Sequence, residues 1–386
     1  MLEKIIKGLK YRLDEENLTA EVIQKRGYKG DIIIPETVVL KKVAYRVTSI
    51  GESAFDCCFS LTSIVIPDSV TSIGPTAFSS CSSLTSMVIP DSVTSIGEKA
   101  FEFCTSLTSI VIPDSVTSIG AWAFRYCISL TSIVIPDSVT SIGEKAFDCC
   151  FSLTSIVIPN SITSIRKGAF ESCRNLTSIT IPDSVTSIGE KAFEFCSSLI
   201  SIVIPDGVTS IGGRAFSGCS SLSSIVIPKS IKSISDDAFV GCSSLISIVV
   251  VDGNTVYDSR EKCNAIIETG TNTLIRGCQI SIIPNGITSI GKNAFGICNT
   301  LISIIIPDGV TSIEAEAFRY CESLKSITIP ASVENIGGLA FCGCKSLTDI
   351  TFQGTIAQWK KITLRDSWKH NIPATVVHCT DGDVEI

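Results

Sequence analysis

Cysteine is the residue type with the widest chemical scope in this chain of 386 residues, which contains 18 cysteines. Twelve of them lie three residues after an Ala-Phe pair: Cys58, Cys81, Cys104, Cys127, Cys150, Cys173, Cys196, Cys219, Cys242, Cys298, Cys321 and Cys344. A metal needs ligands that converge on one point, but these cysteines are spread evenly along the chain, and no CxxC pair with zinc spacing occurs. A disulfide needs particular angles, which identical side chains stacked in parallel do not present. We therefore expect twelve buried free thiols, with the adjacent Cys57 and Cys149 exposed.

Acidic residues form a second regular set, because an aspartate follows the strand proline in most repeats: Asp68, Asp91, Asp114, Asp137, Asp183, Asp206 and Asp308. Carboxylates suit calcium, but one carboxylate per repeat supplies few ligands, and the GGxGxD motif of calcium-binding β-rolls is absent. The two histidines, His370 and His378, have no identifiable nucleophile beside them, and no P-loop or GxGxxG motif occurs. We therefore expect no catalytic residue, no metal site and no cofactor.

All of these residues are placed by an internal repeat of 23 residues. The Ala-Phe pair ends at Phe55 and recurs in 23-residue steps as far as Phe239. After a gap of 56 residues it resumes at Phe295 and continues with the same step to Phe341. A period this regular over most of the chain is the sequence signature of a solenoid, in which similar coils stack on one another.

One repeat, from Leu107 to Ser129, predicts two extended pieces and a helical turn in each coil. The first piece points Ile110 and Ile112 inward and ends at Pro113, because proline lacks the N–H that a strand ladder needs. An Asp-Ser turn leads into the second extended piece. The later Ala-Phe-x-x-Cys spacing suits one helical turn. A single coil cannot bury its own apolar face, so stacking must bury each apolar column against the next coil.

The glycine that precedes each Ala-Phe pair is not invariant along the repeats. It is replaced by Arg166, Ser235 and Glu314 in three coils. We therefore expect that this position does not require a positive φ in every coil.

The repeat resembles the unit of the BspA-like leucine-rich-repeat family, LxxIxIPxxVxxIGxxAFxxCxx, over roughly Ile32 to Leu347. The segment Val256 to Cys278 is similar to an insertion found in that family, and the end of the chain from Gly354 to Gly382 resembles its C-terminal cap. The resemblance implies a curved solenoid with a parallel sheet. It also implies display outside the cell and adhesion to host proteins, which is an analogy of fold and not a reading of the spacing.

The fold class we predict is a repeat solenoid of curved leucine-rich repeats, each with a β-strand, a short second strand and a helical turn, and with a parallel β-sheet on the concave face. Five regions follow in order: a capping hairpin at 1–30, repeats at 31–249, a hairpin insertion at 250–282, repeats at 283–350 and a C-terminal cap at 351–386. A projecting loop or a strand pair is expected between Pro35 and Val47. The cap is expected to hold a short helix from Ile356 to Ile362 and a strand from Ala374 to His378.

The solvent side of the first strands is the candidate binding site, because the residues between the inward isoleucines must point outward. The outward residues form a column of serines beside a column of valines. The partner-binding strip is Ser86, Val88, Ser109, Val111, Ser132, Val134, Ser155, Val157, Val203 and Val226. Contiguous apolar surface of this kind marks contact sites, but β-propensity of a repeated strand explains the valines as well. A regular hydroxyl lattice could also bind a glycan or ice.

Residues beside each Phe vary more between coils, and they are the other candidate surface. Examples are Glu102-Phe103 and Arg125-Tyr126. The sequence does not choose between the two surfaces.

Composition narrows the class of partner. Hydrophobic residues make up 45% of the chain, which supports a large core, and the net charge of −7 argues against nucleic acid. No segment has about 18 consecutive apolar residues, so membrane insertion is not expected, and no signal peptide is recognised. We expect a monomer and a non-enzymatic protein-interaction solenoid, an adhesin or surface-display protein that binds a host protein, another partner protein or a glycan. The alternative is an intracellular scaffold or effector, and the location stays unknown.

Overall fold

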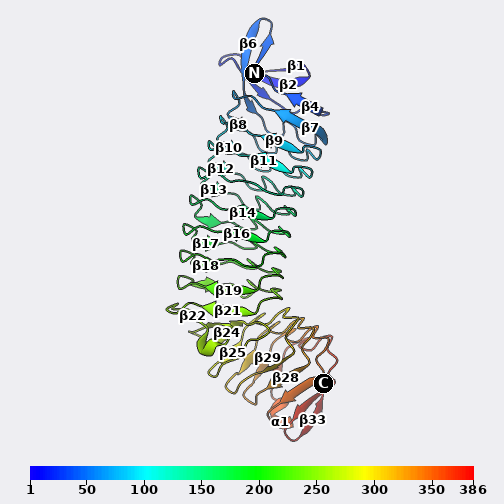
Figure 1. Cartoon of the computed structure of the whole chain (residues 1–386). Coiled ribbons are helices and arrows are strands. Elements are labelled where there is room, and N and C mark those ends of the chain that lie inside the picture. The colour runs from blue at the N-terminus through cyan, green and yellow to red at the C-terminus, as the bar shows by residue number, and fades with distance from the viewer. The chain divides into compact units, whose positions relative to one another are not determined.

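The computed structural model describes residues 1–386, which form two compact units, Met1–Ser197 (unit 1) and Ser198–Ile386 (unit 2). In each unit, short parallel strands stack in two rows and are joined by turns (Figure 1). Each coil contributes a first strand to one row and a second strand to the other. The predicted repeat solenoid is therefore confirmed.

The first strands carry the LxxIxI segments of the repeats. In unit 1 they are β4 (Lys29–Ile33), β7 (Ser60–Val65), β9 (Ser86–Val88), β11 (Ser109–Val111), β14 (Ser155–Val157) and β16 (Ser178–Thr180). In unit 2 they are β19 (Ser224–Ile227), β21 (Ser247–Val250), β26 (Ser303–Ile305), β28 (Ser326–Ile329) and β30 (Asp349–Phe352).

The second strands are shorter, most of them two residues long, and they pair in register with the equivalent residues of the next coil. In unit 1 they are β6 (Val43–Ile50), β8 (Ser72–Ile73), β10 (Ser95–Ile96), β12 (Ser118–Ile119), β13 (Ser141–Ile142), β15 (Ser164–Ile165) and β17 (Ser187–Ile188). In unit 2 they are β18 (Ser210–Ile211), β20 (Ser233–Ile234), β24 (Thr273–Arg276), β25 (Ser289–Ile290), β27 (Ser312–Ile313), β29 (Asn335–Ile336) and β31 (Thr363–Leu364).

The segment around each Phe forms consecutive β-turns, so the predicted helical turn is wrong. The N–H of Cys127 donates to the carbonyl of Phe124 within the coil, whereas the N–H of Phe124 donates to Ala146 of the next coil at 2.8 Å. This alternation requires left-handed residues, and Trp122 and Tyr126 have φ of 54° and 57°. A helix would direct every N–H along its own axis and leave the neighbouring coil without partners. The turns instead join successive coils.

The glycine found before most Ala-Phe pairs allows a close approach between coils. Gly143 does not have a positive φ, and a Cβ on it would lie 2.3 Å from the backbone nitrogen of Ala121 in the preceding coil. The expectation that this position does not require positive φ is confirmed. At Arg166 the same position holds a side chain, so glycine is not required there in every coil.

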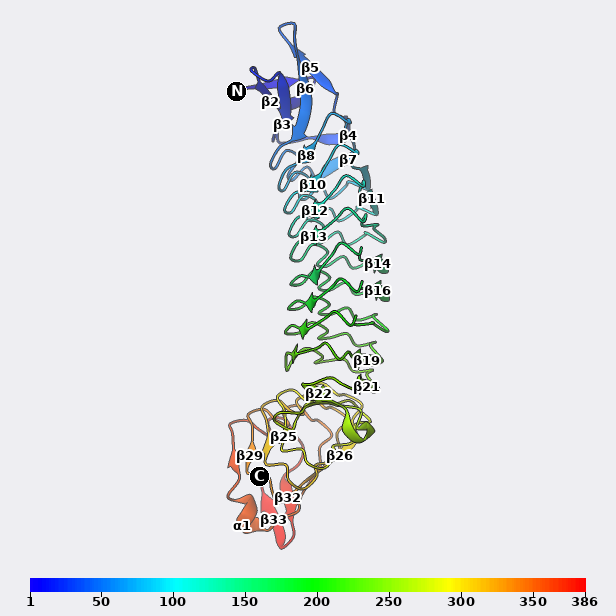
Figure 2. The same ribbon diagram turned by 90° about the vertical axis from the view of Figure 1, so that its left-hand side faces the viewer.

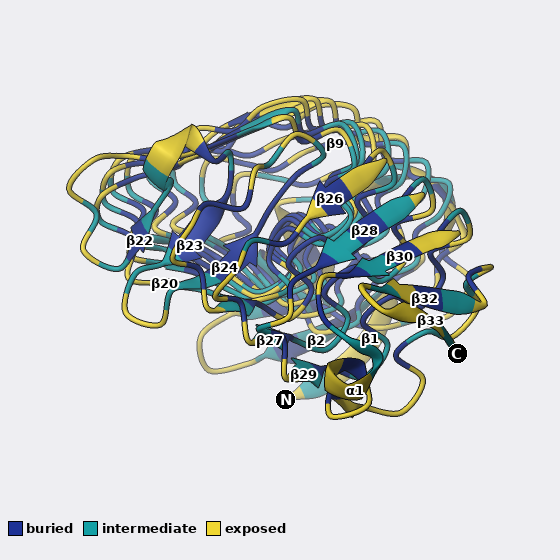
Figure 3. Cartoon of the chain, turned by 90° about the horizontal axis from the view of Figure 1, so that it is seen from below, coloured by how far each residue is buried: buried dark blue, intermediate teal, exposed yellow.

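Buried phenylalanines form the centre of each unit. Successive rings are nearly parallel and stack with centroid separations from 5.1 Å (Phe55–Phe78) to 5.5 Å (Phe147–Phe170). Such distances are typical of offset stacking, and each buried ring adds apolar burial worth about 1.5–3 kcal/mol. Figure 3 shows the buried interior in dark blue and the exposed turns on the rim in yellow.

The N-terminal residues form an antiparallel meander of β1 (Leu2–Ile6), β2 (Leu9–Asp14) and β3 (Thr19–Val22), and β3 then pairs in parallel with β6. Of the two alternatives expected between Pro35 and Val47, the strand pair is present, because β5 (Thr37–Leu40) pairs antiparallel with β6. This hairpin projects beyond the first coil in Figure 2. Strand β1 was not foreseen.

The insertion contains β22 (Tyr257–Asp258), a short 3-10 helix (Arg260–Lys262) and β23 (Ile266–Glu268), which forms the expected hairpin with β24. Strand β24 also pairs in parallel with β25, so the end of the insertion takes the place of a second strand. The side chain of Asn264 accepts the N–H of Ile248, and that of Ser259 accepts the N–H of Val250. These side chains accept the backbone N–H groups at the edge of β21, where a regular coil is missing.

The C-terminal residues hold α1 (Ile356–Trp359), β32 (Val376–Cys379) and β33 (Gly382–Glu385). The helix is shorter than expected, and a capping box between Thr355 and Gln358 fixes its start. Strand β32 pairs with β30 in parallel and with β33 antiparallel. The additional strand β33 was not foreseen.

Candidate partner-binding face

The first strands hold the predicted strip by simple alternation. In β11, Ile110 is buried at 5% exposure, and the next residue, Val111, is 56% exposed. Strands β9 and β11 pair so that Ser109 lies opposite Ser86 and Val111 lies opposite Val88. The outward residues of neighbouring coils are therefore direct neighbours across the ladder.

The predicted strip residues of unit 1 are all on the exposed side. Val134 is the most exposed of its valines, at 79%, although residues 132–134 do not form a regular strand. Here the inter-coil bonds lengthen, since the N–H of Thr131 lies 3.4 Å from the carbonyl of Thr108. Ile133 is nevertheless buried, so the alternation persists. Ser86, Ser109, Ser132 and Ser155 are exposed in the same way.

A threonine column borders the serines and is partly used within the fold. The hydroxyl of Thr108 donates to the carbonyl of Thr85 at 3.0 Å, and Thr177 does the same to Thr154 at 3.1 Å. The strip in unit 1 thus offers valine methyl groups and serine hydroxyls without ionised side chains. A partner can therefore desolvate this surface without desolvating a charged group.

In unit 2 the face is more apolar than the sequence reasoning proposed. Val203 is 78% exposed and Val226 is 49% exposed, as expected for strip residues. Isoleucine replaces the bordering threonine at Ile200 and Ile302, which are 56% and 60% exposed, and Ile305 in the valine column is 69% exposed. These residues were missed, and the change from LTSI to LISI in the repeats would have revealed them.

The edge beside the phenylalanines is tied together by ion pairs between coils. Arg125 donates from Nε to Asp148 at 2.9 Å and from Nη1 to Glu102 at 3.2 Å, and both carboxylates are buried. Burial lowers the pKa of Arg125, but the hydrogen bonds and charges of the two carboxylates outweigh it, so the pKa is raised. Much of the charge at this edge therefore serves the fold.

The aromatic residues of this edge do reach the surface. Phe103 stacks on Tyr126 at 4.8 Å and is 39% exposed. The guanidinium of Arg125 lies 4.9 Å from the Tyr126 ring centroid. In the pair Glu102-Phe103, therefore, the carboxylate is buried and the aromatic ring is exposed. This edge is an alternative contact surface, because arginine and aromatic residues dominate binding hot spots.

The cysteines are free, and the twelve column members are buried. The thiol of Cys127 donates to the carbonyl of Phe101 in the preceding coil at 3.2 Å, and the same contact recurs along the column. Burial raises the pKa of Cys104 to about 12. Cys57 is exposed as expected, but Cys149 is buried, and its thiol donates to Asp148 at 3.2 Å.

The acidic column and the histidines do not assemble a reactive site. Asp114 is exposed at its turn, and it is the neighbouring Ser115 that makes the structural bond, donating to Val93 of the preceding coil at 2.6 Å. No group of three or more His, Cys, Asp or Glu side chains lies close enough to hold a metal ion. His378 contacts Asp383 at 2.8 Å on the exposed surface of β32 and β33.

An acidic cavity of about 310 Å³ lies in unit 2, lined by Asp236, Glu268, Glu314 and Lys292 among others. Burial raises the pKa of Asp236, while the nearby Lys292 lowers it. Glu314 accepts a hydrogen bond from the Ser312 hydroxyl at 2.6 Å. The cavity holds no cysteine or histidine that could act with these carboxylates as a nucleophile and base.

Comparison with known proteins agrees with this architecture. A family model described as BspA type leucine rich repeat region matches residues 48–177, 164–264 and 275–372. The chain belongs to the BspA-type leucine-rich-repeat family. Among curated proteins, none matches this BspA-type chain.

Two solved bacterial structures are similar over almost their whole length. A leucine-rich repeat protein from Bacteroides ovatus is 30% identical, with a TM-score of 0.68, and the match covers 96% of this chain and 99% of that one. A leucine rich cell surface protein from Faecalibacterium prausnitzii is 29% identical, with a TM-score of 0.50, covering 94% and 98%. Within this BspA-type chain, no helix has the length and apolar character to cross a membrane.

Proposed function

We propose that this chain is a non-enzymatic adhesin or surface-display protein that binds a host protein, or another partner protein, through the exposed face of its first strands. The contact residues would be the strip of Ser86, Val88, Ser109, Val111, Ser132, Val134, Ser155, Val157, Val203 and Val226. The observation that carries the proposal is the uncharged row of valines in unit 1, with Val203 and Val226 as their counterparts in unit 2, and these valines are 49–79% exposed. Large exposed apolar patches on monomeric proteins usually mark a contact site.

The size of the face suits a protein partner. Five coils from Val65 to Val157 extend over roughly 20 Å at about 4.8 Å per strand. A stable protein complex buries about 800 Å² on each side, so the partner would also contact the bordering threonines and turns. The Faecalibacterium prausnitzii protein, described as a cell surface protein, supports the surface-display reading.

The second candidate is an intracellular scaffold or effector of the same fold. The observation in its favour is the set of free, buried cysteines, since exported proteins commonly pair their cysteines in disulfides. Locating the protein in fractionated cells of its source organism distinguishes the two candidates.

The binding face is tested by changing Val88, Val111, Val134 and Val157 together to lysine. Binding of the purified full chain is measured by surface plasmon resonance against separately immobilised extracellular proteins and polysaccharides. We expect the fourfold variant to lose binding to the immobilised protein that the unchanged chain binds, because four charges would have to be desolvated. The single change Val111→Lys should weaken binding only modestly, since the partner can shift by one coil on a repetitive face.

A matched control places four lysines on the opposite row of the same unit. Thr94, Thr117, Thr140 and Thr163 are all exposed beside the second strands, and their change to lysine should leave binding intact. Full binding by a folded valine variant would move the site to the edge beside the phenylalanines, where the candidates are the partly exposed Arg125, Tyr126 and Arg319 and the exposed Tyr320. Binding confined to the polysaccharides would replace the protein partner with a glycan.

We also propose that the terminal segments act as caps. The meander at 1–30 and the segment 351–386 would cover the first and last coils, as the ends of a stacked core require. A monomer is expected, and sedimentation equilibrium measures it directly.

A further inference from the structure

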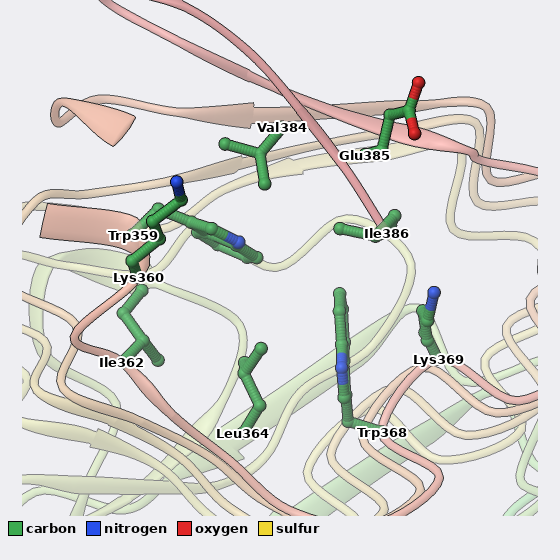
Figure 4. A pocket seen from close by; sticks show the side chains of 9 residues that line it. All are labelled: Trp359, Lys360, Ile362, Leu364, Trp368, Lys369, Val384, Glu385 and Ile386. Carbon is green, nitrogen blue, oxygen red and sulfur yellow. The ribbon is translucent and has the colours of Figure 1, made fainter. Parts of the chain in front are cut away.

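The C-terminal segment of unit 2 lines a pocket of about 260 Å³ that is open to solvent (the cap cavity), which is shown in Figure 4. Trp359 of α1 and Trp368 form one part of its lining. In the view, Leu364 of β31 lies below Trp359 and beside Trp368, and Val384 and Ile386 from the last strand segment lie above Trp368. The lining is therefore aromatic and aliphatic, and it comes from segments up to 27 residues apart in the sequence.

The aromatic part of the lining is held rigidly. Trp359 and Trp368 are 3% and 6% exposed, and their rings meet edge-on at 6.0 Å. Trp368 also contacts Phe341, the last ring of the phenylalanine stack, at 6.0 Å, and Trp359 contacts Phe352 at 5.3 Å. Such packing against the core fixes the two indoles before any ligand arrives, which reduces the entropy lost on binding.

The rim of the cap cavity carries two lysine ammonium groups, together with the Glu385 side chain and the terminal carboxyl group of Ile386. Lys360 and Lys369 line it, and neither ammonium group forms an ion pair with a carboxylate. In Figure 4 the two amino groups lie on different sides of the opening. Glu385 is the one acidic side chain among the lining residues, and its carboxylate points away from the indoles in Figure 4. An apolar cavity with two free cations at its rim is complementary to an apolar anion.

We propose that the cap cavity binds a small carboxylic acid with an aromatic body, such as an arylalkanoic acid. A cavity of roughly 150 Å³ lined by apolar residues holds a benzene ring, so about 260 Å³ accommodates a ring with a short side chain. The ring would pack edge-on or offset against Trp359 and Trp368, as aromatic pairs prefer. The carboxylate would lie at the rim between Lys360 and Lys369. This site is separate from the strip on the first strands.

The probe for the first experiment is 3-phenylpropionate, and the signal is tryptophan fluorescence. A Trp122→Phe background removes the one tryptophan that does not line the cavity, leaving Trp359 and Trp368 as reporters. We expect saturable quenching by 3-phenylpropionate and binding at least tenfold weaker for 3-phenylpropan-1-ol, which has the same ring without the charge. Equal binding of the alcohol, or no saturable change with either compound, would overturn the proposal.

Variants then locate the site. Leu364→Asp places a carboxylate in the lining at a residue already 38% exposed, so folding should survive and binding of the acid should be lost. Lys360→Glu combined with Lys369→Glu should weaken the acid about tenfold or more and leave the alcohol unchanged. The matched control, Lys229→Glu with Lys325→Glu, makes the same change in net charge at exposed residues outside the cavity.

Two outcomes identify a different occupant. Octanoate binding more tightly than 3-phenylpropionate would assign the cavity to aliphatic chains and overturn the aromatic assignment. A dimer in sedimentation equilibrium that dissociates on Leu364→Asp would show that a second copy covers the cavity, which also overturns the proposal.

Discussion

Arg276 donates a hydrogen bond from Nη1 to the carbonyl oxygen of Gly296 at 3.3 Å, and this arginine is 3% exposed and has no carboxylate partner. In regular coils the residue that follows each Phe accepts, through its carbonyl oxygen, a hydrogen bond from a backbone N–H of the preceding coil. The carbonyl of Ser79, for example, accepts the N–H of Cys57. The coil before Phe295 is shortened, and the arginine supplies the missing donor. The arginine of the insertion thus satisfies this carbonyl group, although burying its charge is unfavourable.

In the same shortened coil, we expect that position 277 requires glycine. Gly277 takes the Phe position, since its N–H donates to Ala294, and a Cβ on it would lie 2.3 Å from the ring of Phe295. We expect Gly277→Ala to lower the free energy of unfolding by about 1–3 kcal/mol through overpacking. Gly270→Ala, where a Cβ meets nothing within 4 Å, is the control and should be close to neutral. Urea denaturation measures both, and equal stabilities would contradict this packing.

The buried ion pairs of unit 1 should matter for stability. Arg125→Met leaves Glu102 without its cation, and Asp148 keeps only Lys145 at 3.8 Å. We expect a loss of about 2–3 kcal/mol, because uncompensated buried carboxylates are costly. The exposed pair of Lys345 with Glu322 at 2.6 Å provides the comparison, and Lys345→Met should lose under about 1 kcal/mol. Similar losses in thermal denaturation would show that burial does not distinguish the pairs.

Thiol reactivity should follow exposure. In the native protein, a thiol-specific reagent such as DTNB should modify Cys57 rapidly, and the Cys57→Ser variant should lack that fast phase. Burial and the adjacent Asp56 carboxylate raise the pKa of Cys57, so its rate should continue to rise above pH 9. Denaturation without reductant should release nearly all of the 18 thiols. Recovery of only a few would establish disulfides and refute the free-thiol column.

Alkaline pH should destabilise the protein. Burial raises the pKa of Cys104 to about 12 and that of Cys298 to about 11, whereas an unfolded cysteine has a pKa of about 8.5. Above about pH 8.5 the unfolded chain releases protons that the folded chain retains, so the free energy of unfolding falls as pH rises toward 11 or 12. Below that range this contribution is fully present. Urea denaturation at pH 7.5 and 10.5 measures the fall, and Cys104→Ala should show a smaller one; an equal slope would contradict the assignment.

The repeat pattern was enough to predict the strands and the buried columns. The alternation around Ile110 and the proline that follows determine which side faces inward, because each residue of a strand points opposite to its neighbour. The turn at Tyr126 was mispredicted as helical, since the i, i+3 spacing is equally compatible with consecutive β-turns. What decides between them is the bonding of alternate N–H groups to the next coil, which a single repeat does not display.

The sequence by itself determined the solenoid, its two strand rows and the outward serine and valine columns, because these depend on local alternation and a constant period. Only the tertiary structure decided which side chains meet across coils. The bond from Arg276 to Gly296, the bridge of Arg125 between Glu102 and Asp148, and the approach of Trp359 to Trp368 each join segments that lie apart in the chain. Their contacts depend on how irregular segments pack against regular coils, and local periodicity carries no information about that packing.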